Sequence, residues 1–286
     1  MENKSIRIGL VMKSLQADFF KVMQQGAEEF VNETGCCALT SVGTDSQTET
    51  EKQIALVDRL AAEGMDAIVV VPIDSKALVR PVADAAKKGI TVVNIDIRLD
   101  SDMLRDSGVA IDFVGPDNFA AAYAVGQKVA SELSAGDKVI MIEGLPAADN
   151  ARQRKAGFSK AIAEARLDCV AAAPANWETA TAETVFRKLF AANPDIKAVF
   201  CCNDAMALGV ISVLKDSGKK PGEIKIAGFD NDAVMAPLLK EGWLTATADA
   251  YAQQMAVEGI KHALRLLESK ESHSGDKATS YTIICG

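Results

Sequence analysis

The feature that most constrains the fold of this chain is an alternation of short runs rich in Val and Ile with longer amphipathic stretches, repeated almost from end to end. A strand buried on both faces of a parallel sheet reads as a short apolar run, and a longer amphipathic stretch reads as a helix. Strands that alternate with helices are typical of βαβ units. The sequence therefore predicts an α/β protein built on parallel sheets.

The alternation falls into two similar halves, and a segment at residues 98–115 breaks the rhythm between them. A chain of 286 residues also has about the length of two domains. We predict strands at residues 6–12, 38–43, 67–72, 91–97, 110–114, 138–143, 168–172, 198–202, 224–229, 244–248 and 281–285. We predict helices at residues 17–33, 49–63, 77–88, 119–133, 152–165, 180–192, 206–216, 233–240 and 252–268. Left-handed backbone is expected at the glycines that follow four of these helices, Gly89, Gly136, Gly218 and Gly242.

Charge and hydropathy exclude two classes of partner. The net charge is −8 and no block of Lys and Arg occurs, so the chain lacks the electrostatic signature of a nucleic-acid binder. The longest apolar runs have the length of strands and fall short of the about 18 residues that a spanning helix needs. Residues 1–5 lead into the first strand without the apolar core of a secretory signal, so either the protein is cytoplasmic or a signal has been removed.

The six cysteines do not form a recognisable redox or metal motif, because no pair has the C-x-x-C spacing. Two of the pairs are adjacent in sequence, and adjacent residues of a strand point to opposite faces. We interpret all six as small buried residues. They are Cys36, Cys37, Cys169, Cys201, Cys202 and Cys285.

Function is expected at the carboxyl ends of the strands, where open α/β sheets bind their ligands. Half of the side chains at these ends are aromatic and half form hydrogen bonds. This mixture suits a sugar or polyol, whose C–H faces lie on rings while its hydroxyls bind carboxylates, amides and guanidinium groups. The segments are residues 14–20, 72–75, 96–98 and 143–154, then Trp177, Asn203, Asp204, residues 229–231 and Asp249.

Each of these groups also has a structural explanation. The aromatic pair at the first helix equally suits a hydrophobic core, and carboxylates near helix starts are common N-caps or first-turn residues. An Asp-Asn pair is common turn chemistry, and of two arginines on one helix we expect one to be a solvated charge. In the same order, the residues are Phe19 and Phe20; Asp117 and Asp204; Asp230 and Asn231; and Arg152 and Arg154.

Six motifs together resemble the ribose- and galactose-type periplasmic sugar-binding proteins of ABC transporters, from about residue 5 to the C-terminus. The Asn-Asp-x-Met-Ala-Leu-Gly and Gly-Phe-Asp motifs are specific as a set. The six motifs lie at residues 14–20 (SLQADFF), 72–75 (PIDS), 115–118 (GPDN), 151–158 (ARQRKAGF), 200–209 (FCCNDAMALG) and 228–230 (GFD).

The resemblance implies a ligand shell without a metal or cofactor. It implies stacking rings at Phe19 and Phe20, polar anchors at Asp96 and Asn203, a hydroxyl-binding guanidinium at Arg154, an aromatic wall at Trp177, and Phe229 together with Asp230. Since this shell has no His, we also expect metal-independent binding that is nearly flat between pH 6 and 8.

The first half departs from the pattern of the ribose binder, so ribose itself is not implied. The lengthened segment at residues 98–113 resembles that of family members that bind sugar alcohols, so a polyol stays open. Lys13 and Ala17 replace small polar residues, and Asp249 stands where that pattern has Ala. Arg98 is shifted by one position, which on an extended chain places it on the opposite face unless a bulge restores it. Lys13, Arg98 and Asp249 therefore complete the candidate site.

The resemblance also implies two doubly wound lobes joined by a three-crossover hinge, with the ligand in the cleft between them. The expected lobes are residues 1–114 plus 250–277 and residues 115–249 plus 278–286. Hinge closure would sequester the ligand. A periplasmic monomer that delivers its ligand to a membrane permease is the corresponding expectation.

Two other classes of function stay open. One is the sugar-sensing domain of a lactose-repressor-type regulator without its DNA-binding part, because no helix-turn-helix is present. The other is a nucleotide- or sugar-processing enzyme, although the sequence holds no G-x-G-x-x-G after a strand, no P-loop and no nucleophile elbow. The histidines, His262 and His273, lie away from strand ends, and Asp96 with Asp230 is the one paired-carboxylate candidate.

Overall fold

The computed structural model describes residues 5–286, which form two compact units. Unit 1 comprises the chain up to Pro116 together with Ala147–Asp149 and Tyr251–Thr279; unit 2 comprises Asp117–Pro146, Asn150–Ala250 and Ser280–Gly286. Each unit is therefore discontinuous in sequence. Residues 1–4, on which the expectation about a signal partly rests, lie outside the described residues.

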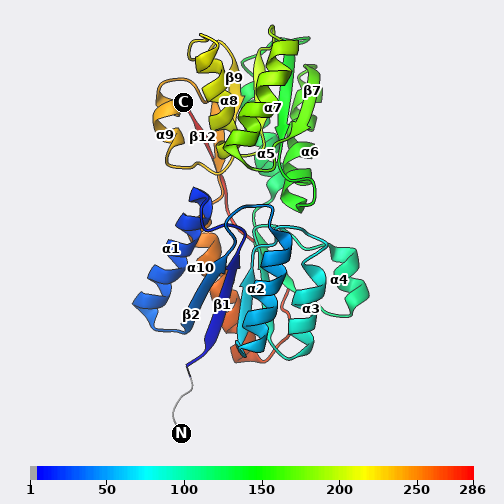
Figure 1. The fold of residues 1–286 in the computed structure, drawn as a ribbon, viewed down its shortest axis with the longest axis vertical. Helices are drawn as coiled ribbons and strands as arrows, with labels where there is room; N and C mark the ends of the chain where they lie inside the picture. Colours follow the sequence, from blue (N-terminus) through cyan, green and yellow to red (C-terminus); the bar gives the residue numbers. More distant parts are fainter. Residues whose placement is uncertain (1–4) are drawn as a thin grey trace. The chain divides into compact units, whose positions relative to one another are not determined.

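The sheet of unit 1 has the strand order β11-β5-β4-β3-β1-β2, and all of its pairings are parallel. Its strands are β1 (Arg7–Met12), β2 (Ala38–Gly43), β3 (Ala67–Val70), β4 (Thr91–Ile95), β5 (Asp112–Gly115) and β11 (Lys277–Ala278). Figure 1 shows α1 and α10 beside each other and α2, α3 and α4 in succession along the sheet. These helices are α1 (Asp18–Thr34), α2 (Thr50–Ala62), α3 (Val79–Lys87), α4 (Ser101–Ser107) and α10 (Ala252–Ser269).

Unit 2 repeats this arrangement with the strand order β12-β10-β9-β8-β6-β7, in which β12 alone is antiparallel to its neighbour. Its strands are β6 (Lys138–Glu143), β7 (Asp168–Pro174), β8 (Ala198–Cys201), β9 (Lys225–Ala227), β10 (Ala246–Asp249) and β12 (Thr282–Cys285). Its helices are α5 (Asn118–Ala130), α6 (Asp149–Glu164), α7 (Thr179–Ala192), α8 (Asp204–Asp216) and α9 (Met235–Lys240). The prediction of two similar doubly wound parallel-sheet lobes is confirmed.

The apolar runs form the cores because the central strands are buried on both faces. All four residues of β3 are inaccessible to solvent, and unit 2 packs Phe158 against Phe200 with their ring centres 5.5 Å apart. One buried polar side chain in unit 1 fixes the ends of β1 and β3. Gln53 donates to the carbonyl oxygens of Met12 and Val71 and accepts from the amide of Ile73, and these bonds replace the ones that its buried amide would make to water.

The predicted boundaries agree with the structure to within a few residues. Gly89, Gly136, Gly218 and Gly242 have φ values of 87°, 86°, 75° and 81°, as their positions after helices required. The helix α4 was missed because none of its side chains is buried, which removes the apolar periodicity on which the prediction rested. Its ends still carry helix signals, since Asp100 accepts a hydrogen bond from the amide of Met103 and Gly108 is left-handed.

The prediction that all six cysteines are buried is wrong at three positions. Cys37, Cys201 and Cys202 are buried, but Cys36 is partly exposed, and Cys169 and Cys285 are exposed because they lie on the edge strands β7 and β12. All six are free thiols.

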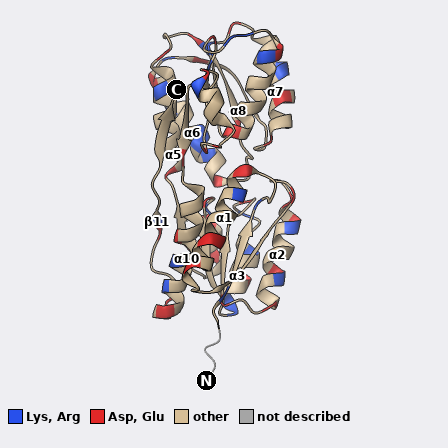
Figure 2. Ribbon diagram, turned by 90° about the vertical axis from the view of Figure 1, so that its left-hand side faces the viewer, with Lys and Arg blue, Asp and Glu red and all other residues tan. Residues whose placement is uncertain are grey.

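Charged residues of both signs are interspersed along the helices, as Figure 2 shows for α2 and α7. Among residues 5–286, the helices are too short or too polar to cross a membrane.

Candidate functional site

The residues predicted from unit 1 gather after β1 and at the start of α1. Phe19 and Phe20 are 8% and 3% exposed, and their rings meet edge to face with centres 5.2 Å apart. The ammonium nitrogen of Lys13 lies 5.5 Å from the centre of the Phe20 ring, close enough for a cation–π contact. The side chain of Lys13 is nearly inaccessible to solvent, so the structure places a cation beside the aromatic pair.

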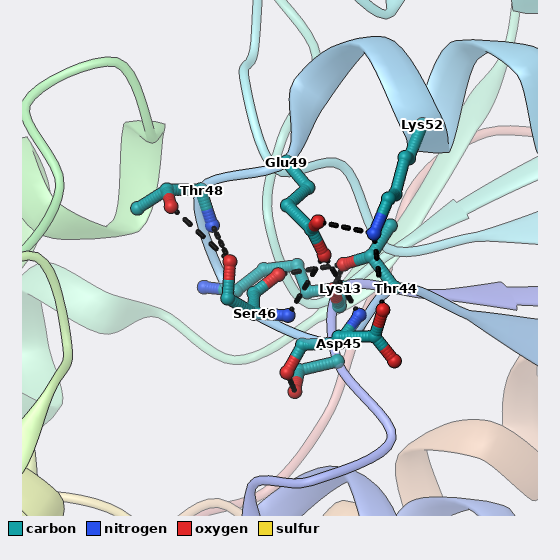
Figure 3. A network of polar contacts seen from close by, with 8 residues as sticks. Lys13, Thr44, Asp45, Ser46, Thr48, Glu49 and Lys52 are labelled. Carbon is teal, nitrogen blue, oxygen red and sulfur yellow. Dashed lines mark hydrogen bonds and ion pairs between the residues drawn. The ribbon is translucent and has the colours of Figure 1, made fainter.

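The loop between β2 and α2 holds the main chain of Lys13 in place, as Figure 3 shows. The Thr44 hydroxyl donates to the Lys13 carbonyl oxygen, and the Leu15 amide donates to the Thr44 carbonyl oxygen at 2.9 Å. Glu49 accepts from the amides of Asp45 and Ser46 at 2.9 and 3.0 Å. The pKa of Glu49 is lowered, first by its bond with Lys52 and then by the amide of Ser46.

Asp96 follows β4 in a bend that an ordinary strand end would not make. Asp96 has a φ of 61° and is 2% exposed, and its amide donates to the Val114 carbonyl oxygen at 3.2 Å. The side chain of Asn94 closes the bend by donating to the Ile97 carbonyl oxygen at 2.7 Å and accepting from the Leu99 amide at 2.8 Å. The bend positions the Asp96 carboxylate at the end of the strand.

The same bend explains the position of Arg98, because simple strand alternation no longer applies beyond Asp96. The guanidinium of Arg98 is paired with Asp276 at 2.6 Å and lies 4.2 Å from the centre of the Phe113 ring. Its side chain is 43% exposed. The structure therefore groups Arg98 with the β5 and β11 edge of the sheet in unit 1.

Arg154 is the centre of the residues gathered in unit 2. Its residue is 2% exposed, Nε donates to Asn118 Oδ1 at 2.8 Å, and Nη1 donates to the Cys202 carbonyl oxygen at 3.0 Å. Nη1 also pairs with Asp230 Oδ1 at 3.2 Å. A buried ion pair is stable only when further hydrogen bonds satisfy both partners, and here Asn118 and Cys202 supply them to the arginine.

The rings around Arg154 support its guanidinium plane. The guanidinium carbon lies 3.5 Å from the centre of the Phe229 ring and 5.5 Å from that of Trp177. Because Phe229 is fully buried against this cation, its ring positions Arg154. Trp177 lies tightly against Gly144, where an added Cβ would overlap the indole. Arg152, two positions from Arg154, is exposed and donates to the Pro146 carbonyl oxygen, so it is the solvated charge of the pair.

Asn203 and Asp204 have different roles at the start of α8. Asn203 is the N-cap, because its Oδ1 accepts from the amide of Met206 at 2.9 Å, and its amide nitrogen is the donor that a ligand could use. Asp204 is fully buried and accepts from the amides of Phe229 and Asp232 and from the Thr247 hydroxyl, at 2.9, 3.0 and 2.9 Å. Asp117 proves to be the N-cap of α5.

Asp204 therefore fixes the loop that presents Asp230, a role that the sequence did not reveal. Burial, followed by the nearby charge of Asp232, raises the pKa of Asp204 to about 8. The same loop brings Asp249 to the site, because Asn231 Nδ2 donates to Asp249 Oδ2 at 3.1 Å.

Unusual backbone marks the same strand ends. Eight non-glycine residues of the described chain have positive φ, and six of them follow β4, β7, β9 or β10. Such conformations cost energy and persist where the surroundings impose them, which is common in ligand-binding sites. The six are Asp96, Asn176, Trp177, Asp230, Asn231 and Tyr251.

The two histidines do not join these groups. His262 is buried on α10, where its Nε2 bonds Asp112 Oδ2 at 2.7 Å and its Nδ1 bonds Arg265 at 2.6 Å. His273 is exposed in the segment that follows α10. Within residues 5–286, no three side chains of metal-binding type lie together.

Comparisons with known proteins point to one family. The family model described as periplasmic binding protein domain matches residues 8–271. The D-ribose/D-allose-binding protein of Pseudomonas aeruginosa is 42% identical over 262 residues, which are 91% of this chain and 82% of that protein. The D-allose-binding periplasmic protein of Escherichia coli is 30% identical over 278 residues, 96% of this chain and 89% of that protein.

Solved structures agree with these sequence relatives. An ABC transporter solute binding protein from Burkholderia multivorans, with an unknown ligand represented as alpha-D-erythrofuranose, is 38% identical with a TM-score of 0.95, over 98% of this chain and 99% of that chain. A periplasmic solute binding protein from Actinobacillus succinogenes with bound D-allose is 31% identical with a TM-score of 0.89, over 98% and 97% of the two chains.

Proposed function

The chain belongs to the periplasmic binding protein domain family, and on this premise we propose that it captures one small neutral sugar or sugar alcohol for an ABC importer. The observation that carries the proposal is the group around Arg154, in which a buried guanidinium pairs with the Asp230 carboxylate and lies 5.5 Å from the centre of an indole ring. Sugar hydroxyls need paired donors and acceptors, and sugar C–H faces need rings. Relatives named for ribose and allose support this reading over that of a truncated regulator.

Arg154 supplies the donors of unit 2. A guanidinium has five N–H groups, and the three on Nε and Nη1 are directed at Asn118, Cys202 and Asp230. We assign the two N–H groups of Nη2 to ligand hydroxyls. Asp230, with Asp249 nearby, then accepts from hydroxyls, and the Asn203 amide donates.

Unit 1 supplies apolar contact and a second pair of charges. Phe19 and Phe20 offer ring edges and faces to C–H groups, and Asp96 accepts from hydroxyls. Lys13 contributes a cation next to Phe20, where the ribose-type pattern has a small polar residue. Arg98 is excluded from this assignment because Asp276 and Phe113 hold it.

We propose that the two lobes close on the ligand by a hinge motion. The lobes would be residues 1–114 plus 250–277 and residues 115–249 plus 278–286, with crossovers near residues 114, 249 and 278. A monomer in the periplasm that docks on a membrane permease completes the proposal. Closure without chemistry would release the ligand unchanged, as a transport protein requires.

An enzyme is the alternative that a specific pair of residues keeps open, because Asp96 and Asp230 are carboxylates at strand ends. The relatives are transport proteins, and Asp230 is already bonded to Arg154. Incubation with aryl glycosides, followed by a product assay, separates the two functions. We expect no product.

A thermal-shift screen tests the proposal. Ribose, allose, arabinose and several sugar alcohols would be added separately, and a ligand that binds only the folded state raises stability by about 2.7 kcal/mol at a hundredfold excess over Kd. We expect at least one member of the set to raise Tm. A flat response to every sugar and polyol, alongside a shift by a nucleotide or an amino acid, would overturn the assignment.

A further inference from the structure

Two adjacent thiols lie side by side where α1 ends and β2 has not yet begun. Gly35, with a φ of 61°, turns the chain out of the helix, and Cys36 and Cys37 follow it before the first residue of the strand. Strand alternation would send their side chains to opposite faces. Because these residues precede the strand, the Cys36 thiol instead donates a weak hydrogen bond to Cys37 Sγ, and the two sulfur atoms are 3.9 Å apart.

This separation suits one bridging atom better than a direct sulfur–sulfur bond. A tetrahedral metal with bonds of about 2.3 Å to two thiolates holds their sulfurs about 3.8 Å apart. A disulfide needs sulfurs about 2.05 Å apart and prefers Cα atoms at least about 4.4 Å apart, whereas neighbouring Cα atoms are about 3.8 Å apart. The 3.9 Å between Cys36 Sγ and Cys37 Sγ is therefore close to the spacing of two sulfurs on one bridging atom and far from that of a disulfide.

The exposure of the two thiols and the side chains around them limit which ligands the Cys36–Cys37 pair can bind. Cys36 is partly exposed and Cys37 is buried, so a ligand enters from the side of Cys36. No third Cys, His, Asp or Glu joins the pair among residues 5–286, which argues against a four-ligand structural zinc site.

We propose that Cys36 and Cys37 form a two-sulfur binding site for one soft, thiophilic centre, such as a trivalent arsenic that already carries one carbon substituent and therefore needs two thiols. With phenylarsine oxide, two As–S bonds form, the arsenic–oxygen bond breaks, and the two thiol protons leave with the oxygen as water. The oxidation state of arsenic and of both sulfurs stays the same. Soft sulfur ligands favour soft centres over Mg²⁺ or Ca²⁺.

The site lies at the opposite end of α1 from Phe19 and Phe20. The 17 residues of this helix span about 25 Å. Loading Cys36 and Cys37 should therefore leave sugar binding unchanged. This separates a failure of the present proposal from a failure of the proposed transport function.

The test treats the full, reduced protein with one equivalent of phenylarsine oxide and follows its intact mass. We expect one adduct that survives an excess of a monothiol and is removed by a dithiol. Cys36→Ser should lose that resistant adduct, and the ligand-induced rise in Tm should show that the variant is folded. Cys37→Ser is the second variant and should also lose the resistant adduct. Because Cys37 is buried, the folding of this variant is checked in the same way.

Two matched controls test whether the adduct forms at Cys36 and Cys37 and not at the other thiols. Replacing the exposed thiols together, Cys169→Ser with Cys285→Ser, should leave the adduct intact. The other adjacent pair, Cys201 and Cys202, is fully buried and should not react. A resistant adduct that persists in Cys36→Ser, or that disappears in the Cys169 and Cys285 double variant, would overturn the proposal, as would its absence from the unmodified protein.

Discussion

Arg154 shows how one buried side chain organises its surroundings. Two of its nitrogens are used by Asn118, Cys202 and Asp230, and the Phe229 ring supports its plane at 3.5 Å. Leaving a buried charge without its partner costs about 3–5 kcal/mol, whereas losing an exposed charge costs little. The two arginines of α6 should therefore behave differently when replaced.

We expect Arg154→Ala to weaken sugar binding at least tenfold, because ligand hydroxyls and the Asp230 carboxylate lose their donor. Arg154→Lys should also weaken binding, since an ammonium cannot reproduce the planar fork. Titration calorimetry measures both variants, with Arg152→Ala as the control that keeps wild-type affinity. Equal affinity of Arg154→Ala and wild type would remove Arg154 from the site.

The two tryptophans allow the site of unit 2 to be monitored separately. Trp177 lies within 5.5 Å of the Arg154 guanidinium carbon, whereas Trp243 is buried near Lys215, whose Nζ lies 5.1 Å from its ring centre. We expect sugar to change the emission of Trp177, so Trp177→Phe should bind with modestly lower affinity and lose most of the fluorescence change. Trp243→Phe should keep the full change. The reverse pattern would place Trp177 outside the site.

At this scale, residue types and some roles were predictable, but the packing partners of each side chain were not. The sequence placed Arg152 and Arg154 on one helix. Only the structure shows that Arg152 is exposed to solvent and that Arg154 is buried among its hydrogen-bond partners. Phe229 was expected at the site without a defined role, and the structure places its ring against the guanidinium of Arg154. Neither outcome is visible in a pattern, because both depend on which elements pack together.

The loop after β9 is an element whose shape depends on Asp204. Three donors converge on this buried carboxyl group, and two of them belong to the amides of Phe229 and Asp232. Its pKa of about 8 introduces a titration near neutrality that the expectation of flat binding between pH 6 and 8 did not include. We therefore expect the affinity for sugar to change as the pH approaches 8 and not to stay flat.

The sign of the stability effect follows from linkage. The folded state keeps a proton on Asp204 that the unfolded chain loses near pH 3.8, so this contribution is complete below that pH and is lost as pH rises to about 8. We expect Tm to fall across this interval and the Asp204→Asn variant to show a shallower fall. Thermal unfolding from pH 4 to 9 measures both curves, and parallel curves would contradict the assignment.

Helices and strands were predictable wherever their side chains were buried. The runs at β3 and β6 gave their strands directly, because both faces of these strands are covered. The exposed helix α4 and the two-residue strand β11 lacked such a signal. The sharp bend at Asp96 was also invisible, since Asn94 closes it through contacts that no local pattern encodes.

For the whole molecule, the sequence predicted two doubly wound lobes because each half repeats the same strand and helix rhythm, and both sheets have equivalent strand orders. The identity of the sugar was not predictable, because departures from the ribose-type pattern, such as Lys13 and Asp249, do not say which hydroxyls they would bind. The binding groups described within each unit contain no histidine, and no metal cluster lies within residues 5–286.

We therefore expect sugar binding to be independent of metal ions. Prolonged treatment with a chelator, followed by titration in metal-free buffer, should return the untreated affinity. A protein whose binding disappears with the chelator and returns with calcium would show that a carboxylate group here holds an ion.

We propose that this chain binds a small sugar or sugar alcohol reversibly and does not transform it. Titration calorimetry with the compound selected by the thermal screen, combined with recovery and analysis of that compound, tests both halves of the claim at once. We expect one saturable site, at least tenfold weaker binding in Arg154→Ala, and a ligand recovered unchanged. Heat without saturation, or a recovered product that differs from the added sugar, would contradict it.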